Sequence, residues 1–196
     1  MSILFNAAIF LITLVLTVGF FRKDGSWNAE NGKKAFRFFT VQSNVLCAVS
    51  ALLICVFPDA HAVWLLKYAG TAAVCVTMLT VLFYLGPVYS YKKLLSGTDL
   101  FMHLITPLLA LVSCCVWEKR GLAFWEALWG LAPVLLYGAL YMYRVVFCPK
   151  DKPETPEKAW DDFYGFNQTG KYYLSAAAMV AGAFLICMGL MALQNM

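Results

Sequence analysis

Charged residues are scarce in this 196-residue chain. Only 13% of the residues are Asp, Glu, Lys or Arg, whereas 62% are hydrophobic, and the mean hydropathy is +0.71. A water-soluble domain is about a quarter charged and near half apolar, so this composition excludes a soluble enzyme or binding domain. The apolar runs also exceed the ~9–11 residues of a membrane β-strand. We therefore expect an all-α integral membrane protein.

Metal-binding and redox motifs are missing as well. The chain has only two histidines, His61 and His103, and they start hydrophobic segments at opposite membrane faces, which excludes a haem held between two histidines. The seven cysteines form no CxxC motif and no Cys/His cluster. Vicinal Cys114 and Cys115 point to different sides of a helix and cannot share a metal. We expect small buried thiols, with no metal and no other cofactor.

Hydrophobic segments long enough to cross a hydrocarbon core ~30 Å thick recur along the chain. The first lacks a basic n-region and a small-residue cleavage site, so we expect a retained span and not a signal peptide. The sequence predicts one domain, residues 1–196, built as a bundle of membrane-spanning helices. The predicted spans are 3–20, 39–57, 62–84, 99–117, 124–146 and 172–193.

Basic residues lie almost entirely on one side of this topology. Of the 15 Lys and Arg residues, only Lys67, Lys119 and Arg120 fall on the side that carries both termini. Because basic loops stay cytoplasmic, we expect the other loops inside and both termini outside, in the cell membrane if the chain is bacterial. The charges flank the spans and form no stripe, so they indicate no nucleic-acid partner. The loops expected inside are 21–37, 86–98 and 147–171.

The second predicted span begins with a polar stretch, residues 40–44. Thr40, Ser43 and Asn44 follow the i, i+3, i+4 spacing of one helix face, and such a face does not point into lipid without cost. We expect it to face the bundle interior, while Gln42 points about 200° away from Thr40. Two roles are open for this face. It either forms interhelical hydrogen bonds worth ~0.6–2 kcal/mol each, or it lines a polar cavity.

His103 starts the fourth span from the same side of the membrane as Thr40. The two residues should lie in the same leaflet at similar depth, although they are far apart in sequence. An ionisable side chain inside a membrane is a candidate functional residue, although many such histidines serve helix packing. Pro107 removes the backbone hydrogen bond to the His103 carbonyl. A kink there would widen a cavity beside the imidazole.

The connection before the last span changes character along its length. Its first half is charged and proline-rich, whereas its second half, from Trp160 onward, is aromatic. Aromatic residues there are typical of an interfacial belt. In the alternative, the segment folds back over the mouth of the bundle and lines it with Asp162, Tyr164 and Asn167.

Three motifs, FFTVQSN, MHLITP and DDFYGFNQTGK, occur in an order and spacing that resemble the androgen-induced-gene family of membrane proteins and its bacterial relatives. That family includes the androgen-dependent tissue-factor-pathway-inhibitor-regulating protein. Its members are similar over nearly the whole chain, with six helices, an early Thr in the second helix and a His followed by Pro in the fourth. A Tyr-Pro-Phe-type motif precedes their last helix, and here Tyr164-Gly165-Phe166 has Gly at the proline position.

The resemblance implies a chemistry. Animal members of the family are described as threonine hydrolases that cleave fatty-acid esters of hydroxy fatty acids, so it implies Thr40 as the nucleophile and His103 as the base. A threonine hydroxyl needs such a base, and histidine suits that task near neutral pH. Asp99 is in place to orient the imidazole or to start its helix as a first-turn anion. Other candidates for oxyanion, substrate or imidazole contacts are Asn44, Gln42, Ser43, Asp162, Tyr164 and Asn167.

Three functions therefore stay open, and the first two use a polar cavity near the cytoplasmic side. The first is an intramembrane hydrolase of lipid esters. The second is a non-enzymatic protein that binds or transports a lipid or small amphiphile through the same cavity, although the lack of an internal repeat argues against an inverted-repeat transporter. A purely structural or regulatory membrane partner is the third alternative. The sequence identifies neither the natural ester nor the oligomeric state.

Overall fold

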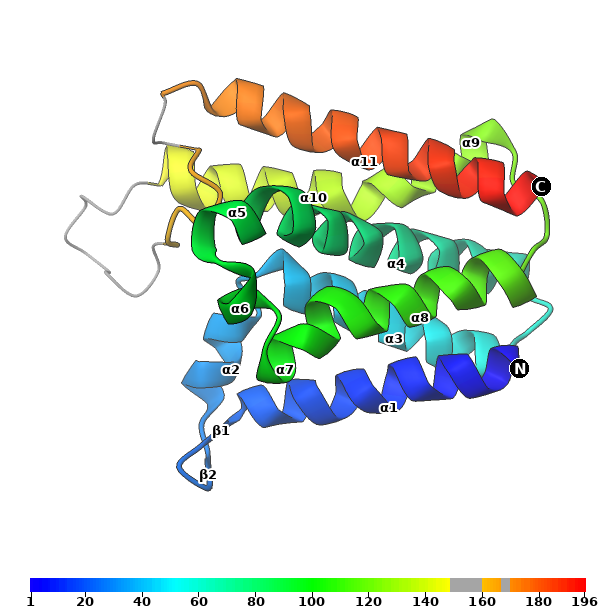
Figure 1. Ribbon diagram of the computed structural model, residues 1–196, viewed down its shortest axis with the longest axis horizontal. Helices are drawn as coiled ribbons and strands as arrows, with labels where there is room; N and C mark the ends of the chain where they lie inside the picture. The colour runs from blue at the N-terminus through cyan, green and yellow to red at the C-terminus, as the bar shows by residue number, and fades with distance from the viewer. Residues whose placement is uncertain (149–159, 167–169) are drawn as a thin grey trace.

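The computed structural model describes residues 1–148, 160–166 and 170–196. Within them, six helices are long and apolar enough to cross a membrane, which confirms the expectation of a multi-pass, all-α membrane protein. The helices run side by side, with both chain termini at one end (Figure 1). We call this end the terminal end. The opposite end carries α2 (Ala29–Ala35) and α6 (Tyr91–Leu94), each with lysines in its last turn, and is called the basic end.

Half of the spans are single helices and half are built from several pieces. The single helices are α1 (Ser2–Phe20), α3 (Phe39–Val56) and α11 (Tyr172–Asn195). The third span, His61–Tyr89, consists of α4 (His61–Thr80), a π-helical turn (Val81–Leu85) and α5 (Gly86–Tyr89). The fourth, Gly97–Trp117, consists of α7 (Gly97–Leu100), a π-helical turn (Phe101–Ile105), α8 (Thr106–Val112) and a second π-helical turn (Ser113–Trp117). The fifth, Phe124–Phe147, consists of α9 (Phe124–Ala127), a 3₁₀ turn (Leu128–Leu131), α10 (Ala132–Met142) and a π-helical turn (Tyr143–Phe147).

A short hairpin follows the first span at the basic end. Its strands β1 (Arg22–Lys23) and β2 (Ser26–Trp27) pair antiparallel. The two turn residues, Asp24 and Gly25, have φ of 50° and 78°, and a two-residue hairpin turn with positive φ at both positions favours Asp-Gly. Asn28 then starts α2, because its side chain accepts a hydrogen bond from the backbone N–H of Asn31. This polar segment therefore leads the chain back to the bundle outside the spans.

The third span lies at the centre of the bundle. Its membrane-length window is 56% buried, whereas those of α1 and α11 are each 17% buried. Small residues in α4 allow neighbouring helices to come close. A Cβ atom at Gly70 would lie 2.9 Å from the Cα atom of Cys47 in α3, so the two backbones pack directly against each other. This close packing fixes α3, which carries Thr40, against the core.

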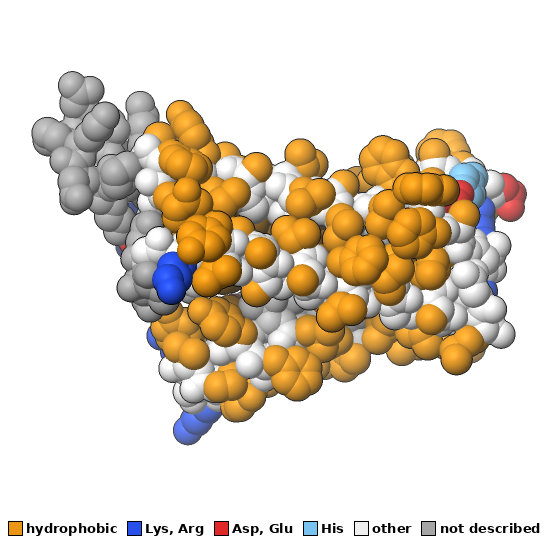
Figure 2. Space-filling model, turned by 90° about the horizontal axis from the view of Figure 1, so that it is seen from above, with side chains coloured by type: hydrophobic (Ala, Val, Ile, Leu, Met, Phe, Trp, Pro, Cys, Tyr) orange, Lys and Arg blue, Asp and Glu red, His pale blue; other side chains and the backbone are white. Residues whose placement is uncertain are grey.

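The outer surface matches that of a protein surrounded by lipid. Figure 2 shows a face whose middle is covered by hydrophobic side chains, with charged side chains at its two ends. Leu136 of α10 is 74% exposed and Leu185 of α11 is 69% exposed. Large apolar side chains exposed over a contiguous surface mark a partner or membrane surface. The charged ends then lie where lipid headgroups and water begin.

Candidate functional site

Thr40 and His103 meet at the basic end of the bundle. Thr40 is in the first turn of α3, and His103 is in the π-helical turn Phe101–Ile105 of the fourth span. The Thr40 hydroxyl oxygen Oγ1 lies 3.4 Å from His103 Nε2, at the long end of hydrogen-bonding distance. The two side chains that sequence placed in one leaflet therefore face each other across a helix–helix contact.

A backbone carbonyl fixes the orientation of the His103 ring. Ring nitrogen Nδ1 lies 2.7 Å from the carbonyl oxygen of Leu94, the last residue of α6. A carbonyl only accepts hydrogen bonds, so Nδ1 carries the hydrogen. In the neutral ring, Nε2 is then the acceptor, and it faces the Thr40 hydroxyl. The tautomer is the one that a general base for Thr40 requires.

The turn that carries His103 takes an unusual form because of Pro107. The backbone N–H of Thr106 donates to the carbonyl of Phe101, five residues earlier, as in a π-helical turn. Pro107, the second residue of α8, has no N–H to offer. The chain thus accommodates the proline by widening the turn around His103, which agrees with the expectation of an irregular backbone at this point.

In this structure the imidazole nitrogen Nδ1 bonds to the Leu94 carbonyl and not to Asp99 or Asp162, the two carboxylates suggested from the sequence. Asp99 lines the cavity beside His103, but the Nδ1 hydrogen already points at the Leu94 carbonyl. Asp162 instead accepts hydrogen bonds from the Tyr141 hydroxyl, 3.0 Å away, and from the Phe166 backbone N–H, 2.8 Å away. Asp162 therefore organises the loop before α11 and does not contact the imidazole.

Asn44 braces the site. Its amide nitrogen donates to the Thr40 carbonyl at 2.8 Å and to the Met102 carbonyl at 3.0 Å. Both acceptors are carbonyls, so the group between them is the NH₂ and both of its hydrogens are used. Asn44 thus connects the turn that bears Thr40 to the turn that bears His103. The expected role as an oxyanion donor is not compatible with this geometry, because no N–H of the side chain is left over.

Ser43 and Gln42 lie close in sequence but point elsewhere. The Ser43 hydroxyl lies 2.9 Å from the Thr77 hydroxyl of α4 and 3.1 Å from the Thr40 carbonyl. The Gln42 amide donates to the Phe36 carbonyl at 2.8 Å, which caps the end of α2. Ser43 is therefore an interhelical contact and Gln42 a helix cap, and neither faces the imidazole.

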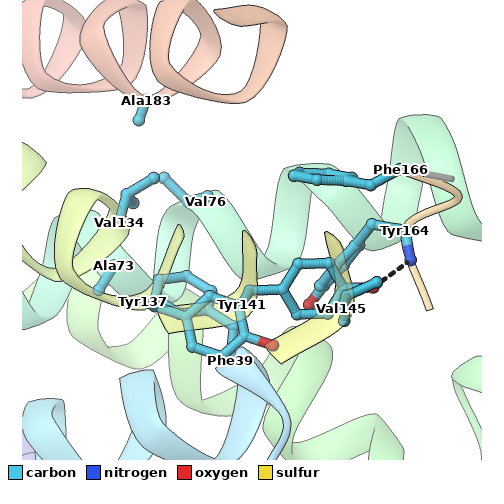
Figure 3. Packing of buried hydrophobic residues seen from close by; sticks show 10 residues of the cluster. All are labelled: Phe39, Ala73, Val76, Val134, Tyr137, Tyr141, Val145, Tyr164, Phe166 and Ala183. Atoms are coloured by element: carbon cyan, nitrogen blue, oxygen red, sulfur yellow. Dashed lines mark hydrogen bonds between the residues drawn. The ribbon is translucent and has the colours of Figure 1, made fainter. Parts of the chain in front are cut away.

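The described part of the last loop folds back onto the bundle. Tyr164 and Phe166 are buried and pack edge-on against Tyr141 of α10, each with ring centroids 5.1 Å from it. Figure 3 shows these rings together with Phe39 of α3, and the dashed line marks the Tyr164 N–H donating to the Tyr141 hydroxyl. Burial raises the pKa of Tyr164 to about 12, so it stays protonated. The described part of this segment therefore returns to the bundle, where Tyr164 lines cavities and Asp162 does not, and Asn167 lies outside the described residues.

Two cavities meet at Thr40. The first, the histidine cavity, has a volume of about 470 Å³ and is lined mainly by apolar side chains, with His103, Lys93 and Asp99 among them. The second, the apolar cavity, has a volume of about 250 Å³ and lies between α3, α4, α10 and α11. Thr40 and Tyr164 line both cavities. A reacting group at Thr40 thus has space on two sides, and the imidazole and the charged side chains Lys93 and Asp99 line only the first.

A second buried polar centre lies at the terminal end, and it was not anticipated from the sequence. Glu118 accepts hydrogen bonds from Ser2 at 2.8 Å, from Ser113 at 2.7 Å and from Asn6. Its other carboxylate oxygen lies 3.8 Å from the ammonium of Lys67 in α4, which is fully buried. Burial raises the pKa of Glu118, but Lys67 and the hydrogen bonds outweigh burial and leave this pKa below its ordinary value. The available signal was Lys67 itself, a lysine inside a predicted apolar span.

The described residues contain no group of three or more His, Cys, Asp or Glu side chains that could hold a metal ion. No protein-family model, curated protein or solved structure matches this chain.

Proposed function

We propose that this protein is an intramembrane hydrolase of lipid esters, with Thr40 as the nucleophile and His103 as the general base. One observation carries the proposal. The Thr40 hydroxyl lies 3.4 Å from His103 Nε2, while the bond from Nδ1 to Leu94 leaves Nε2 as the acceptor. The resemblance to the androgen-induced-gene family, whose animal members are described as threonine hydrolases, supports the same roles.

The reaction proceeds in two halves. His103 Nε2 takes the hydroxyl proton as Thr40 Oγ1 attacks the ester carbonyl carbon, and the protonated ring then gives that proton to the departing alcohol oxygen. The acid is left bound to Thr40 as an ester. Water, deprotonated by Nε2, attacks this acyl-threonine, and the proton returns to Thr40 Oγ1 as the free acid leaves. General-base assistance of this kind contributes ~10²–10⁴-fold.

The backbone at the start of α3 supplies the oxyanion donors in this scheme. N–H groups in the first turn of a helix have no carbonyl one turn earlier to bond with, and the positive end of the helix dipole favours a negative charge there. We therefore assign the N–H groups of Thr40 and Val41, in the first turn of α3, as the donors to the developing oxyanion. Asn44 acts indirectly, because its two hydrogen bonds hold the turn that carries Thr40 and the turn that carries His103 in fixed relative positions.

The location suits an amphiphilic substrate. In the orientation that the positive-inside rule favours, the histidine cavity opens toward the cytoplasmic side and both termini lie outside. Acyl chains then come from the surrounding lipid, and the ester rests near the headgroups. The proposed reaction uses a lipid or acyl-ester substrate and water, and it requires no metal, no cofactor and no nucleic acid.

The second candidate function is non-enzymatic binding or transport of a lipid or small amphiphile. One observation favours it. Within the described parts of the chain, the His103 ring bonds to Thr40 and to the Leu94 carbonyl but to no carboxylate, so the pair lacks the acidic member of a Ser-His-Asp triad. A neutral carbonyl orients the ring but stabilises the imidazolium less than a carboxylate does.

Kinetics of purified variants separate the two functions. The wild type in detergent is expected to hydrolyse p-nitrophenyl acyl esters, and Thr40→Ala and His103→Ala should each lower kcat/KM by at least ~10²-fold. Thr40→Ser keeps a hydroxyl and should keep measurable turnover. Ser50→Ala is the matched control, because the Ser50 hydroxyl donates to the Cys47 carbonyl of its own helix and should leave the rate nearly unchanged. Equal rates in the wild type, Thr40→Ala and His103→Ala would leave only the binding function.

A further inference from the structure

We propose, on the basis of the hydrolase function above, that the apolar cavity holds the acyl chain of the ester and that Gly138 sets the length of chain accepted. The inference goes beyond the reaction itself to the class of substrate. It assigns the two halves of the ester to the two cavities that meet at Thr40, and it names one residue of α10 as a specificity determinant.

Proton transfer decides which half of the ester lies in which cavity. The alcohol oxygen must receive its proton from His103 Nε2 as the bond to the carbonyl carbon breaks, so it must lie beside the imidazole. His103 lines the histidine cavity but not the apolar cavity. The alcohol half therefore belongs in the histidine cavity, where Lys93 and Asp99 offer polar contacts. The acyl half then extends from Thr40 in the other direction, into the apolar cavity.

The walls of the apolar cavity suit a hydrocarbon chain because most of their side chains are apolar and three of their hydroxyl groups already have hydrogen-bond partners elsewhere. The Tyr137 hydroxyl donates to the Arg37 carbonyl at 3.0 Å, and the Tyr141 hydroxyl donates to Asp162 at 3.0 Å. Thr77 bonds to Ser43 at 2.9 Å. These side chains line the cavity with rings and methyl groups, and Figure 3 shows the two tyrosine rings beside Phe39. An acyl chain loses no hydrogen bond by lying against them.

Gly138 is the point at which this cavity is open to a larger side chain. It lines the apolar cavity, and a Cβ atom built there meets no other atom within 4 Å. Gly130, in the same span, differs: a Cβ atom there would lie 2.6 Å from the sulfur of Cys187. A side chain at position 138 therefore takes up cavity space without a clash with the fold, and it shortens the chain that fits.

A neighbouring groove supplies the matched control. It has a volume of about 720 Å³, lies along α4 and α11, and is lined by Gly182 but by neither Thr40 nor His103. A Cβ atom at Gly182 also meets nothing within 4 Å. Because this groove does not reach the reacting atoms, a larger residue at position 182 should leave chain-length preference unchanged, although the substitution is chemically identical.

The test is a chain-length series of p-nitrophenyl esters, from acetate to palmitate, with the wild type, Gly138→Leu, Gly138→Ala and Gly182→Leu. Gly138→Leu should lower kcat/KM for the palmitate ester at least ~10-fold relative to the butyrate ester, since one methylene in an apolar pocket is worth about 10-fold or more. Gly138→Ala should give a smaller change of the same sign and covers the case that the leucine variant does not fold. Gly182→Leu should keep the wild-type profile. An unchanged profile in Gly138→Leu, or a shift in Gly182→Leu instead, would overturn the assignment.

A binding measurement distinguishes failure of this inference from failure of the hydrolase proposal. Displacement of a fluorescent fatty acid by palmitate and by butyrate needs no turnover. If the wild type hydrolyses no ester but Gly138→Leu selectively weakens palmitate binding, the hydrolase proposal fails and the chain-binding assignment stands. If the wild type hydrolyses esters and Gly138→Leu changes neither binding nor the kinetic profile, the assignment fails and the hydrolase proposal stands.

Discussion

At the scale of single residues, the candidate site is defined by the hydrogen-bond partner of each polar group. The Leu94 carbonyl holds one imidazole nitrogen and leaves the other for Thr40. Asn44 uses both amide hydrogens on carbonyls of the two turns that carry the pair. The Leu94 carbonyl thus positions the His103 ring, and the Asn44 amide positions the two turns that carry Thr40 and His103. Neither contact involves a carboxylate.

Asn44→Ala should impair both stability and activity. The substitution removes the buried donor that the Thr40 and Met102 carbonyls share, at a cost of ~1–3 kcal/mol in the free energy of unfolding. Without these bonds the turns that carry Thr40 and His103 can shift relative to each other, which should lower kcat more than it raises KM. Thermal unfolding in detergent and ester kinetics measure the two effects. Ser50→Ala is the control, because the Ser50 hydroxyl bonds only to the nearby Cys47 carbonyl, and similar losses in both variants would count against the brace.

At the scale of elements, short irregular pieces place the functional groups while long helices hold them. The acceptor for His103 comes from the end of α6 (Tyr91–Leu94), where the last carbonyls of a helix have no intrahelical partner. At the terminal end, Glu118 follows the fourth span and bonds to α1 through Ser2 and Asn6. Lys67 of α4 lies against the same carboxylate. Glu118 therefore joins three helices.

Glu118→Gln should destabilise the bundle strongly, whereas Lys67→Met combined with Glu118→Gln should be milder. The single change leaves a buried ammonium without its counter-charge, at a cost of ~3–5 kcal/mol, and removing both charges avoids it. The lowered pKa of Glu118 means that it stabilises the fold at pH above its unfolded pKa and loses this effect as pH falls through its folded pKa. Thermal midpoints in detergent across the acid range should fall for the wild type and stay flatter for the double variant. A single variant as stable as the wild type would contradict this.

The sequence predicted the long elements and one pair of residues, and the physical reasons are clear. Apolar runs of membrane length define the spans, and the side of the membrane from which a span starts placed Thr40 and His103 together. The Leu94 carbonyl was not predictable, because it depends on the end of a four-residue helix that has no periodic pattern. The partners of Asn44 and the buried contact between Lys67 and Glu118 depend on how helices pack, which composition and spacing do not specify.

At the scale of the whole molecule, the two ends of the bundle differ. At the terminal end, side chains bond to backbone carbonyls at the end of the fourth span: Trp64 donates to the Glu118 carbonyl at 2.8 Å, and Gln194 donates to the Cys114 carbonyl at 2.7 Å. The histidine cavity and the apolar cavity meet at Thr40 near the basic end, and Tyr164 lines both. The proposed reaction site therefore lies at the end of the bundle opposite these contacts.

The proposed orientation is tested by cysteine labelling in intact cells. In a Cys148→Ser background, Ser26→Cys in the β1–β2 hairpin should react with a membrane-impermeant maleimide only after permeabilisation, because the basic loops are expected inside. Lys119→Cys, at the terminal end, should react without it. Both positions are exposed, so accessibility does not limit either reaction. The reverse pattern would place the site on the opposite side of the membrane.

The most direct test of the central claim is covalent capture of the nucleophile. Purified wild-type protein is incubated with a long-chain alkyl fluorophosphonate, and the modified residue is found by mass spectrometry of its peptides. The proposed chemistry predicts one adduct, on Thr40, that is lost in Thr40→Val, retained in Thr40→Ser and slowed at least ~10²-fold in His103→Ala. Labelling at Ser43 or another hydroxyl, or equal labelling of Thr40 in the presence and absence of the imidazole, would contradict it.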